Sequence, residues 1–101
     1  MEKSKKLIWS KNAKNDLQQI YNYYLQFSTN SANKIIDKII KKTSILEIFG
    51  FEKSGQIDEY NKKYRRLIES NYKIFYKEFD TKILIIRIFN CYQNPNIIKS
   101  F

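Results

Sequence analysis

The sequence predicts an α+β fold in which a helical hairpin packs on one face of a four-stranded, largely antiparallel sheet. Residues 1–61 carry two apolar stripes with helical spacing, and residues 62–101 carry three strand-like runs separated by short breaks. A strand candidate precedes the helices, so the expected order of elements is β-α-α-β-β-β. A chain of 101 residues is long enough for one hydrophobic core, and we expect a single domain over residues 1–101.

The first element is a short strand candidate, Lys5–Ser10. Leu7 and Trp9 alternate with Lys6 and Ile8, which places the two pairs on opposite faces of a strand. This strand can pair with the free side of the last strand of the predicted sheet.

Two amphipathic helices follow. Ser10 can accept hydrogen bonds from the free amides of a first helical turn, and so it is expected to begin the first helix. Cap-type residues at 28–31 separate the two helices, and Gly50 is expected to end the second. The apolar stripe of the first helix consists of Ala13, Leu17, Ile20, Tyr21, Tyr24 and Leu25. That of the second consists of Ala32, Ile35, Ile36, Ile39, Ile40, Thr43, Leu46 and Phe49.

The remaining chain is expected to form a loop and then a β-meander. The loop covers Phe51–Asn61 and contains Gly55. The breaks at 70–71 and 80–81 contain Asn and Asp, which tolerate the left-handed backbone of tight hairpins. The last strand is apolar on both faces and is therefore expected to be internal. The three predicted strands are Lys63–Glu69, Tyr72–Phe79 and Lys82–Cys91.

Positive charge is concentrated in the predicted sheet. The chain has a net charge of +9, of which +6 lies in residues 62–101, with nine Lys or Arg against three acids. All three arginines, Arg65, Arg66 and Arg87, fall in predicted strands. Lysines scattered over the helices are typical of a solvated face. A cationic sheet that carries aromatic side chains indicates a polyanionic partner.

Composition argues against several classes of protein. No apolar run approaches the length of a membrane span, and the N-terminus lacks the apolar segment of a signal peptide. Cys91 is the only cysteine, which excludes an intramolecular disulfide and fits a cytoplasmic location. Because there is no histidine, we expect no zinc site, and nothing in the sequence points to a cofactor.

The ordered set of segments resembles the RelE/ParE family of toxins from bacterial type II toxin–antitoxin pairs. The resemblance covers nearly the whole chain. It rests on A-K-N-D-L-Q-Q-I-Y-N-Y-Y at 13–24, Gly55 in the loop, Y-R-R-L-I-E-S-N-Y-K-I-F-Y at 64–76, and I-L-I-I-R-I-F-N-C-Y-Q-N-P at 83–95.

The resemblance implies a toxin that arrests growth and is neutralised by a cognate antitoxin, expected to be acidic and encoded by a neighbouring gene. RelE-like members cleave messenger RNA in the ribosomal A site, without a metal, whereas ParE-like members poison DNA gyrase. Ribosome-dependent cleavage of messenger RNA is the leading hypothesis at this point. The alternatives are a gyrase inhibitor without catalysis of its own, or a non-toxic basic module that binds nucleic acid.

The resemblance also implies candidate catalytic residues. Cleavage through the 2′-hydroxyl of RNA needs a base, a cationic clamp for the phosphate and an acid for the leaving oxygen. Arg66 and Lys73 occupy positions where RelE-like members place cationic catalytic groups. Strand parity can put them on one exposed sheet face with Tyr64, Phe75 and Lys77. Crowding by other cations would favour the neutral form of Lys73, so it can serve as the base.

Two tyrosines depart from the ribonuclease pattern. Tyr64 stands where such enzymes usually have a lysine, and Tyr92 stands where related members have an arginine. Tyr92 can replace the tyrosine acid that RelE-like enzymes carry on a C-terminal helix, but the absence of the arginine equally removes a phosphate clamp. The candidate catalytic residues are therefore Lys73, Arg66 and Tyr92, and the candidate target-binding residues are Tyr64, Arg66, Lys77 and Arg87.

Overall fold

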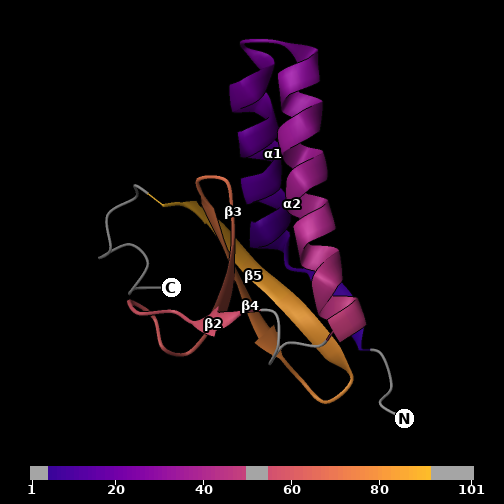
Figure 1. The fold of residues 1–101 in the computed structure, drawn as a ribbon, viewed down its shortest axis with the longest axis vertical. Coiled ribbons are helices and arrows are strands. Elements are labelled where there is room, and N and C mark those ends of the chain that lie inside the picture. Colours follow the sequence, from indigo (N-terminus) through magenta and orange to yellow (C-terminus); the bar gives the residue numbers. More distant parts are fainter. Residues whose placement is uncertain (1–4, 50–54, 92–101) are drawn as a thin grey trace.

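A computed structural model describes residues 5–49 and 55–91, which form two helices and a five-stranded sheet (Figure 1). None of the described helices is both long and apolar enough to cross a membrane. The elements are β1 (Lys6–Trp9), α1 (Lys11–Leu25), α2 (Thr29–Phe49), β2 (Gln56–Ile57), β3 (Arg65–Glu69), β4 (Tyr72–Glu78) and β5 (Lys82–Asn90).

The sheet has the order β1-β5-β4-β3-β2. All neighbouring strands are antiparallel except β1 and β5, which run parallel, so the predicted pairing of the first strand with the last is confirmed. β5 lies between β1 and β4 and is internal, as its two apolar faces indicated.

The predicted count of four strands is wrong. Residues 56–57, expected to belong to a loop, form the fifth strand β2 at the edge beside β3. Both residues are exposed, and two residues are too short a run to show a strand pattern in the sequence. The pairing continues past β2, because the amide of Asp58 donates to the carbonyl of Tyr64 at 3.0 Å.

Local sequence explains where the helices begin. The Ser10 hydroxyl accepts from the amide of Ala13 at 3.0 Å and donates to the carbonyl of Ile86 at 2.7 Å. It therefore caps α1, as predicted, and also ties the helix start to β5. Ser28 plays the capping role for α2, since its hydroxyl accepts from the amide of Ser31 at 2.9 Å. Gly50, the predicted end of α2, lies outside the described residues.

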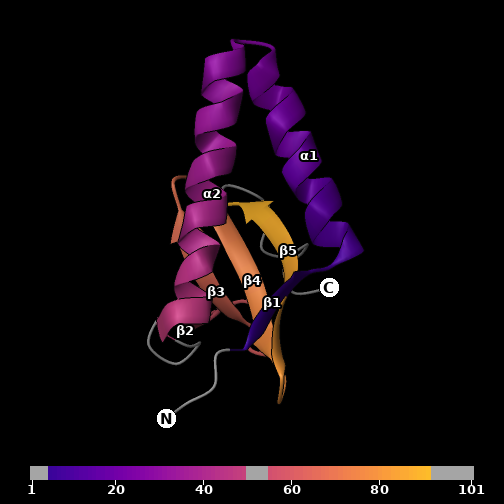
Figure 2. The same ribbon diagram turned by 90° about the vertical axis from the view of Figure 1, so that its right-hand side faces the viewer.

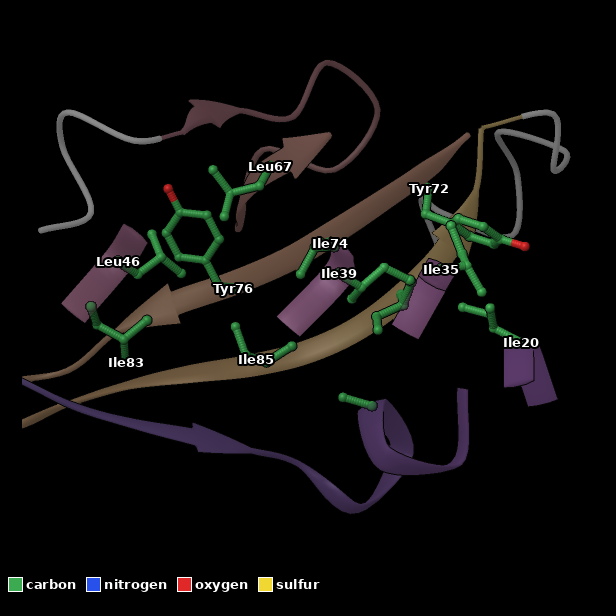
Figure 3. Close-up of a cluster of buried hydrophobic side chains, with 12 residues drawn as sticks. Ile20, Ile35, Ile39, Leu46, Leu67, Tyr72, Ile74, Tyr76, Ile83 and Ile85 are labelled. Atoms are coloured by element: carbon green, nitrogen blue, oxygen red, sulfur yellow. The ribbon is translucent and has the colours of Figure 1, made fainter. Parts of the chain in front are cut away.

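The helical hairpin packs on one face of the sheet and extends past one end of it (Figure 1 and Figure 2). Helix and strand side chains point toward one another across this layer (Figure 3). The predicted stripes supply most of the helical core residues, but Leu25 and Ile40 are exposed. The buried residues of the core are Ala13, Ile20, Ile35, Ile39, Leu46, Leu67, Tyr72, Ile74, Tyr76, Ile83, Ile85 and Ile88.

Strand β4 is buried on both faces, because residues 72–76 are all buried in succession. Tyr72, Ile74 and Tyr76 face the helices and join the main core. Phe75 faces the other way and forms a second, small cluster with Phe89, their rings meeting edge to face with centroids 5.8 Å apart. The face of the sheet turned away from the helices, called the outer face below, is therefore partly covered.

Gly55 is required by a close approach between the edge segment and β4. A methyl group at this position would collide with the Tyr76 hydroxyl and would lie 2.7 Å from the Arg66 carbonyl oxygen. Tyr76 is fully buried, and burial raises the pKa of its phenol to about 12. The Gly55 carbonyl also accepts from the Arg65 guanidinium at 3.1 Å. Gly55 therefore brings the start of β2 against both β3 and β4.

We expect Gly55→Ala to lower the free energy of unfolding by about 1–3 kcal/mol, because backbone and a buried ring must move to admit the methyl group. Urea denaturation measures this loss. Gln56→Ala, at the exposed neighbouring position, is the control and should change stability by less than about 0.5 kcal/mol. Equal stability of Gly55→Ala and the wild-type chain would contradict the close approach.

Candidate functional site

Strand register places the predicted cations on one face, as strand parity indicated. Arg66 pairs with Phe75, which pairs in turn with Arg87, and Lys73 lies two residues from Phe75 on β4. Residues paired across neighbouring strands point to the same side, and Phe75 faces away from the helices. The predicted common face is therefore the outer face.

The expectation that Arg66 and Lys73 are exposed is wrong. The Lys73 side chain is 9% exposed and the Arg66 side chain 16%. Both cations contact the buried carboxylate of Asp58, which the sequence analysis did not single out. Its Oδ1 accepts from Arg66 Nε at 3.0 Å and from Lys73 Nζ at 3.4 Å.

The other carboxylate oxygen of Asp58 accepts hydrogen bonds within the turn that Asp58 begins. Oδ2 accepts from the backbone amides of Tyr60 at 2.9 Å and Asn61 at 2.8 Å. The Tyr60 ring in this turn lies over the Lys73 ammonium, 4.8 Å from the ring centroid. We refer to Asp58, Tyr60, Arg66 and Lys73 as the Asp58 cluster. In this cluster the Tyr60 ring covers the Lys73 ammonium and the Asp58 carboxylate pairs with it. We had expected only cations around Lys73.

Arg87 makes a second charged contact that the sequence analysis missed. Its guanidinium donates two hydrogen bonds to the carboxylate of Asp16 in α1, from Nε to Oδ2 at 2.8 Å and from Nη2 to Oδ1 at 3.0 Å. The same Oδ2 accepts from the amide of Ile88 at 2.9 Å. Hydrogen bonding to Asp16 raises the pKa of Arg87. This pair joins the start of α1 to β5, so a target that binds Arg87 must compete with Asp16.

The remaining predicted residues lie in other surroundings. Tyr64 packs against the cluster of Phe75 and Phe89. Lys77 is exposed, and its ammonium lies 5.8 Å from the ring centroid of Phe79. Tyr92 lies outside the described residues. The structure thus brings Arg66 and Lys73 together at Asp58, whereas Arg87 and Lys77 have other contacts.

A signal for both missed acids exists in the sequence. Asp16 lies three residues after Ala13 and four before Ile20, so it belongs to the apolar stripe of α1. An acid on this buried stripe needs a cation as its partner. Asp58 precedes a polar turn, where Asp side chains commonly accept from amides two and three residues later. The identity of their cationic partners has no such local signal.

A separate concave surface lies between the helices and β1. It is an apolar groove of about 450 Å³ lined by Trp9, Lys14, Leu17, Gln18, Tyr21, Ile36 and Ile40. Ile40, left out of the core, lines this groove and is 46% exposed. The described residues therefore offer two surfaces, the partly covered outer face of the sheet and this helix groove.

A helical hairpin on a mixed sheet, with its first strand parallel to its last, agrees with the toxin class that the sequence resembles. Over residues 7–95 the chain matches the family described as the ParE toxin of the type II toxin–antitoxin system, parDE. The chain therefore belongs to the ParE toxin family, whose members are paired with a cognate antitoxin.

Among solved structures, a chain of the chromosomal ParDE toxin–antitoxin system from P. aeruginosa is similar, with a TM-score of 0.76 and 22% sequence identity. The match covers 86% of this chain and 96% of that chain, and at this identity it shows a shared fold. A comparison with curated proteins found no match.

We expect Asp58→Asn to lower the free energy of unfolding by about 3–5 kcal/mol, because it leaves two largely buried cations without an anion. Lys73→Met should cost less, since Arg66 still neutralises Asp58. The double variant should be less destabilised than the sum of the two single variants. Chemical denaturation measures all three.

Asp37→Asn is the matched control, because Asp37 pairs with Lys41 at 2.9 Å on the exposed surface of α2. It should change stability by less than about 1 kcal/mol. If Asp58→Asn costs no more than Asp37→Asn, the Asp58 cluster does not hold the outer face together.

Proposed function

We propose that this ParE-type toxin arrests growth by inhibiting DNA gyrase and does not cleave messenger RNA. The observation that carries the proposal is the Asp58 cluster. Ribonuclease action of the kind expected from the resemblance requires Arg66 and Lys73 to reach a phosphate and a 2′-hydroxyl. A catalytic group must first lie within hydrogen-bonding reach of the substrate.

In the Asp58 cluster these two cations are committed to a protein carboxylate. An RNA phosphate would have to displace Asp58 from Arg66 and move the Tyr60 ring off Lys73. Displacing Asp58 would leave that carboxylate buried without its cations, which is costly. The ParE family match favours the same choice, because ParE-like proteins are the gyrase inhibitors within the wider RelE/ParE group.

We infer that the antitoxin covers the helix groove with an apolar segment. The groove is concave and mostly apolar, and exposed apolar surfaces of this kind are typical of partner sites. The net charge of +9 would attract an acidic antitoxin over a distance and speed its association. The groove then supplies the apolar contact that charge alone lacks.

The gyrase proposal predicts the outcome of two assays on the purified chain. The protein should slow the supercoiling of relaxed plasmid by gyrase, and it should leave messenger RNA on translating ribosomes uncut. In cells, induction of the chain should produce DNA breaks while messages stay intact. Messages cut within codons, together with unimpaired gyrase, would instead establish the ribonuclease alternative.

The groove proposal predicts that Ile40→Glu weakens neutralisation by the antitoxin at least about tenfold, because a charge would replace a buried apolar contact. Titration calorimetry against the protein encoded by the neighbouring gene measures this affinity. Gln19→Glu, the same charge change on an exposed part of α1 outside the groove, should leave it unchanged. Equal weakening by both variants would place the apolar contact elsewhere.

A further inference from the structure

Three lysines gather on the outer face of the sheet at the end formed by the β4–β5 hairpin. Lys6 of β1 pairs with Lys82 of β5, and Lys77 of β4 pairs with Leu84, two residues along β5 from Lys82. The neighbours of these lysines, such as Leu7 and Ile83, pack into the core on the helix side. Because side chains alternate along a strand, the three lysines point to the outer face.

Phe79 lies among these lysines, and the residue is 40% exposed. The ammonium groups of Lys77 and Lys82 lie 5.8 Å and 5.3 Å from its ring centroid. A large aromatic ring kept at the surface beside two cations contributes little to the core. We call Lys6, Lys77, Phe79 and Lys82 the hairpin patch.

Two acids lie beside the hairpin patch: Glu78, which points to the opposite face, and Asp80, which is exposed in the β4–β5 turn. Glu78 pairs in register with the buried Ile83 and forms a salt bridge with Lys5 at 2.9 Å. Within the described residues, none of the three lysines of the hairpin patch takes part in a salt bridge. Like charges directly opposite each other, as in the Lys6–Lys82 pair, destabilise a sheet.

This arrangement contrasts with the other cations of the outer face. Arg66, Lys73 and Arg87 are each neutralised by a carboxylate of the chain. The three lysines of the hairpin patch instead form no salt bridge within the described residues, and two of them lie next to an exposed ring. An anion supplied from outside would relieve the repulsion between Lys6 and Lys82.

We propose that the hairpin patch binds single-stranded nucleic acid, with the lysines contacting backbone phosphates and the Phe79 ring stacking on an unpaired base. Phosphates neutralise the ammonium groups with release of counterions. An aromatic side chain beside a cationic track is the combination that binds single strands without sequence preference. A duplex would engage the lysines but would offer no unstacked base to Phe79. An acidic peptide would make no comparable use of the ring.

The proposal is independent of gyrase as the target, since it concerns the isolated chain and its own surface. The hairpin patch would give the toxin a direct contact with DNA. Such a contact is useful to a toxin whose target, gyrase, is itself bound to DNA. Purified toxin that inhibits gyrase but does not bind single strands would overturn this proposal alone. Binding of single strands without effect on gyrase would overturn only the proposed function.

The test is fluorescence anisotropy of the purified chain with a labelled oligo-dT of about 12 nucleotides. The same measurement uses an abasic strand of equal length, a duplex of equal length and a polyglutamate peptide as comparison probes. We expect the oligo-dT to bind most tightly. Tighter binding of the duplex or of polyglutamate would overturn the proposal.

Two variants separate phosphate contact from base stacking. Lys77→Ala with Lys82→Ala should reduce the salt slope of oligo-dT binding by roughly 1.4, the share of two phosphate contacts on a single strand. Phe79→Ala should weaken oligo-dT binding roughly 5- to 100-fold, the range for loss of one stacked base, and should leave the abasic strand almost unaffected.

The matched control removes two lysines from the exposed face of α2, Lys34→Ala with Lys38→Ala. This variant has the same net charge as the double variant of the hairpin patch and should keep the salt slope of the wild-type chain. An equal loss in the control would show that binding depends on total charge only. A Phe79→Ala variant that weakens binding of the abasic strand as much as oligo-dT would exclude stacking.

Discussion

The burial of β4 on both of its faces is the constraint on which the rest of the structure depends. On the helix side, Tyr72, Ile74 and Tyr76 are buried in the main hydrophobic core. On the outer side the strand contains Lys73, and a cation in a buried strand requires an anion nearby. Asp58, which directly follows β2, supplies that anion. The pairing of β2 with β3 places this carboxylate beside Arg66 and Lys73.

Two buried carboxylates, Asp58 and Asp16, divide the cations of the described sheet into two groups. Asp58 and Asp16 neutralise Arg66, Lys73 and Arg87, and they join distant elements, the β2 edge to the sheet in one case and α1 to β5 in the other. These cations stabilise the fold. Lys6, Lys77 and Lys82 of the hairpin patch form no such pair within the described residues.

Proteins of one fold can therefore differ in function when the side chains at the same positions have different partners. Cations on the outer face are the groups that the RNA-cleaving members of the wider group are expected to direct at a substrate. In this chain Arg66 and Lys73 contact Asp58, an acid of the chain itself. The same fold also has an apolar groove along the helices and a group of lysines at the β4–β5 hairpin.

The sequence by itself determined both helices and four of the five strands of the described residues, but not the edge strand β2, because periodicity and capping act within a few residues. It predicted both helices, the cap at Ser10, the pairing of the first strand with the last, and the shared face of Arg66 and Lys73. Only the tertiary structure decided what those side chains meet. Asp58 lies 8 residues from Arg66 and 15 from Lys73, and Asp16 lies 71 from Arg87. No local pattern links charges across such separations; the folded sheet brings them together, and their burial decides which cations remain for a partner.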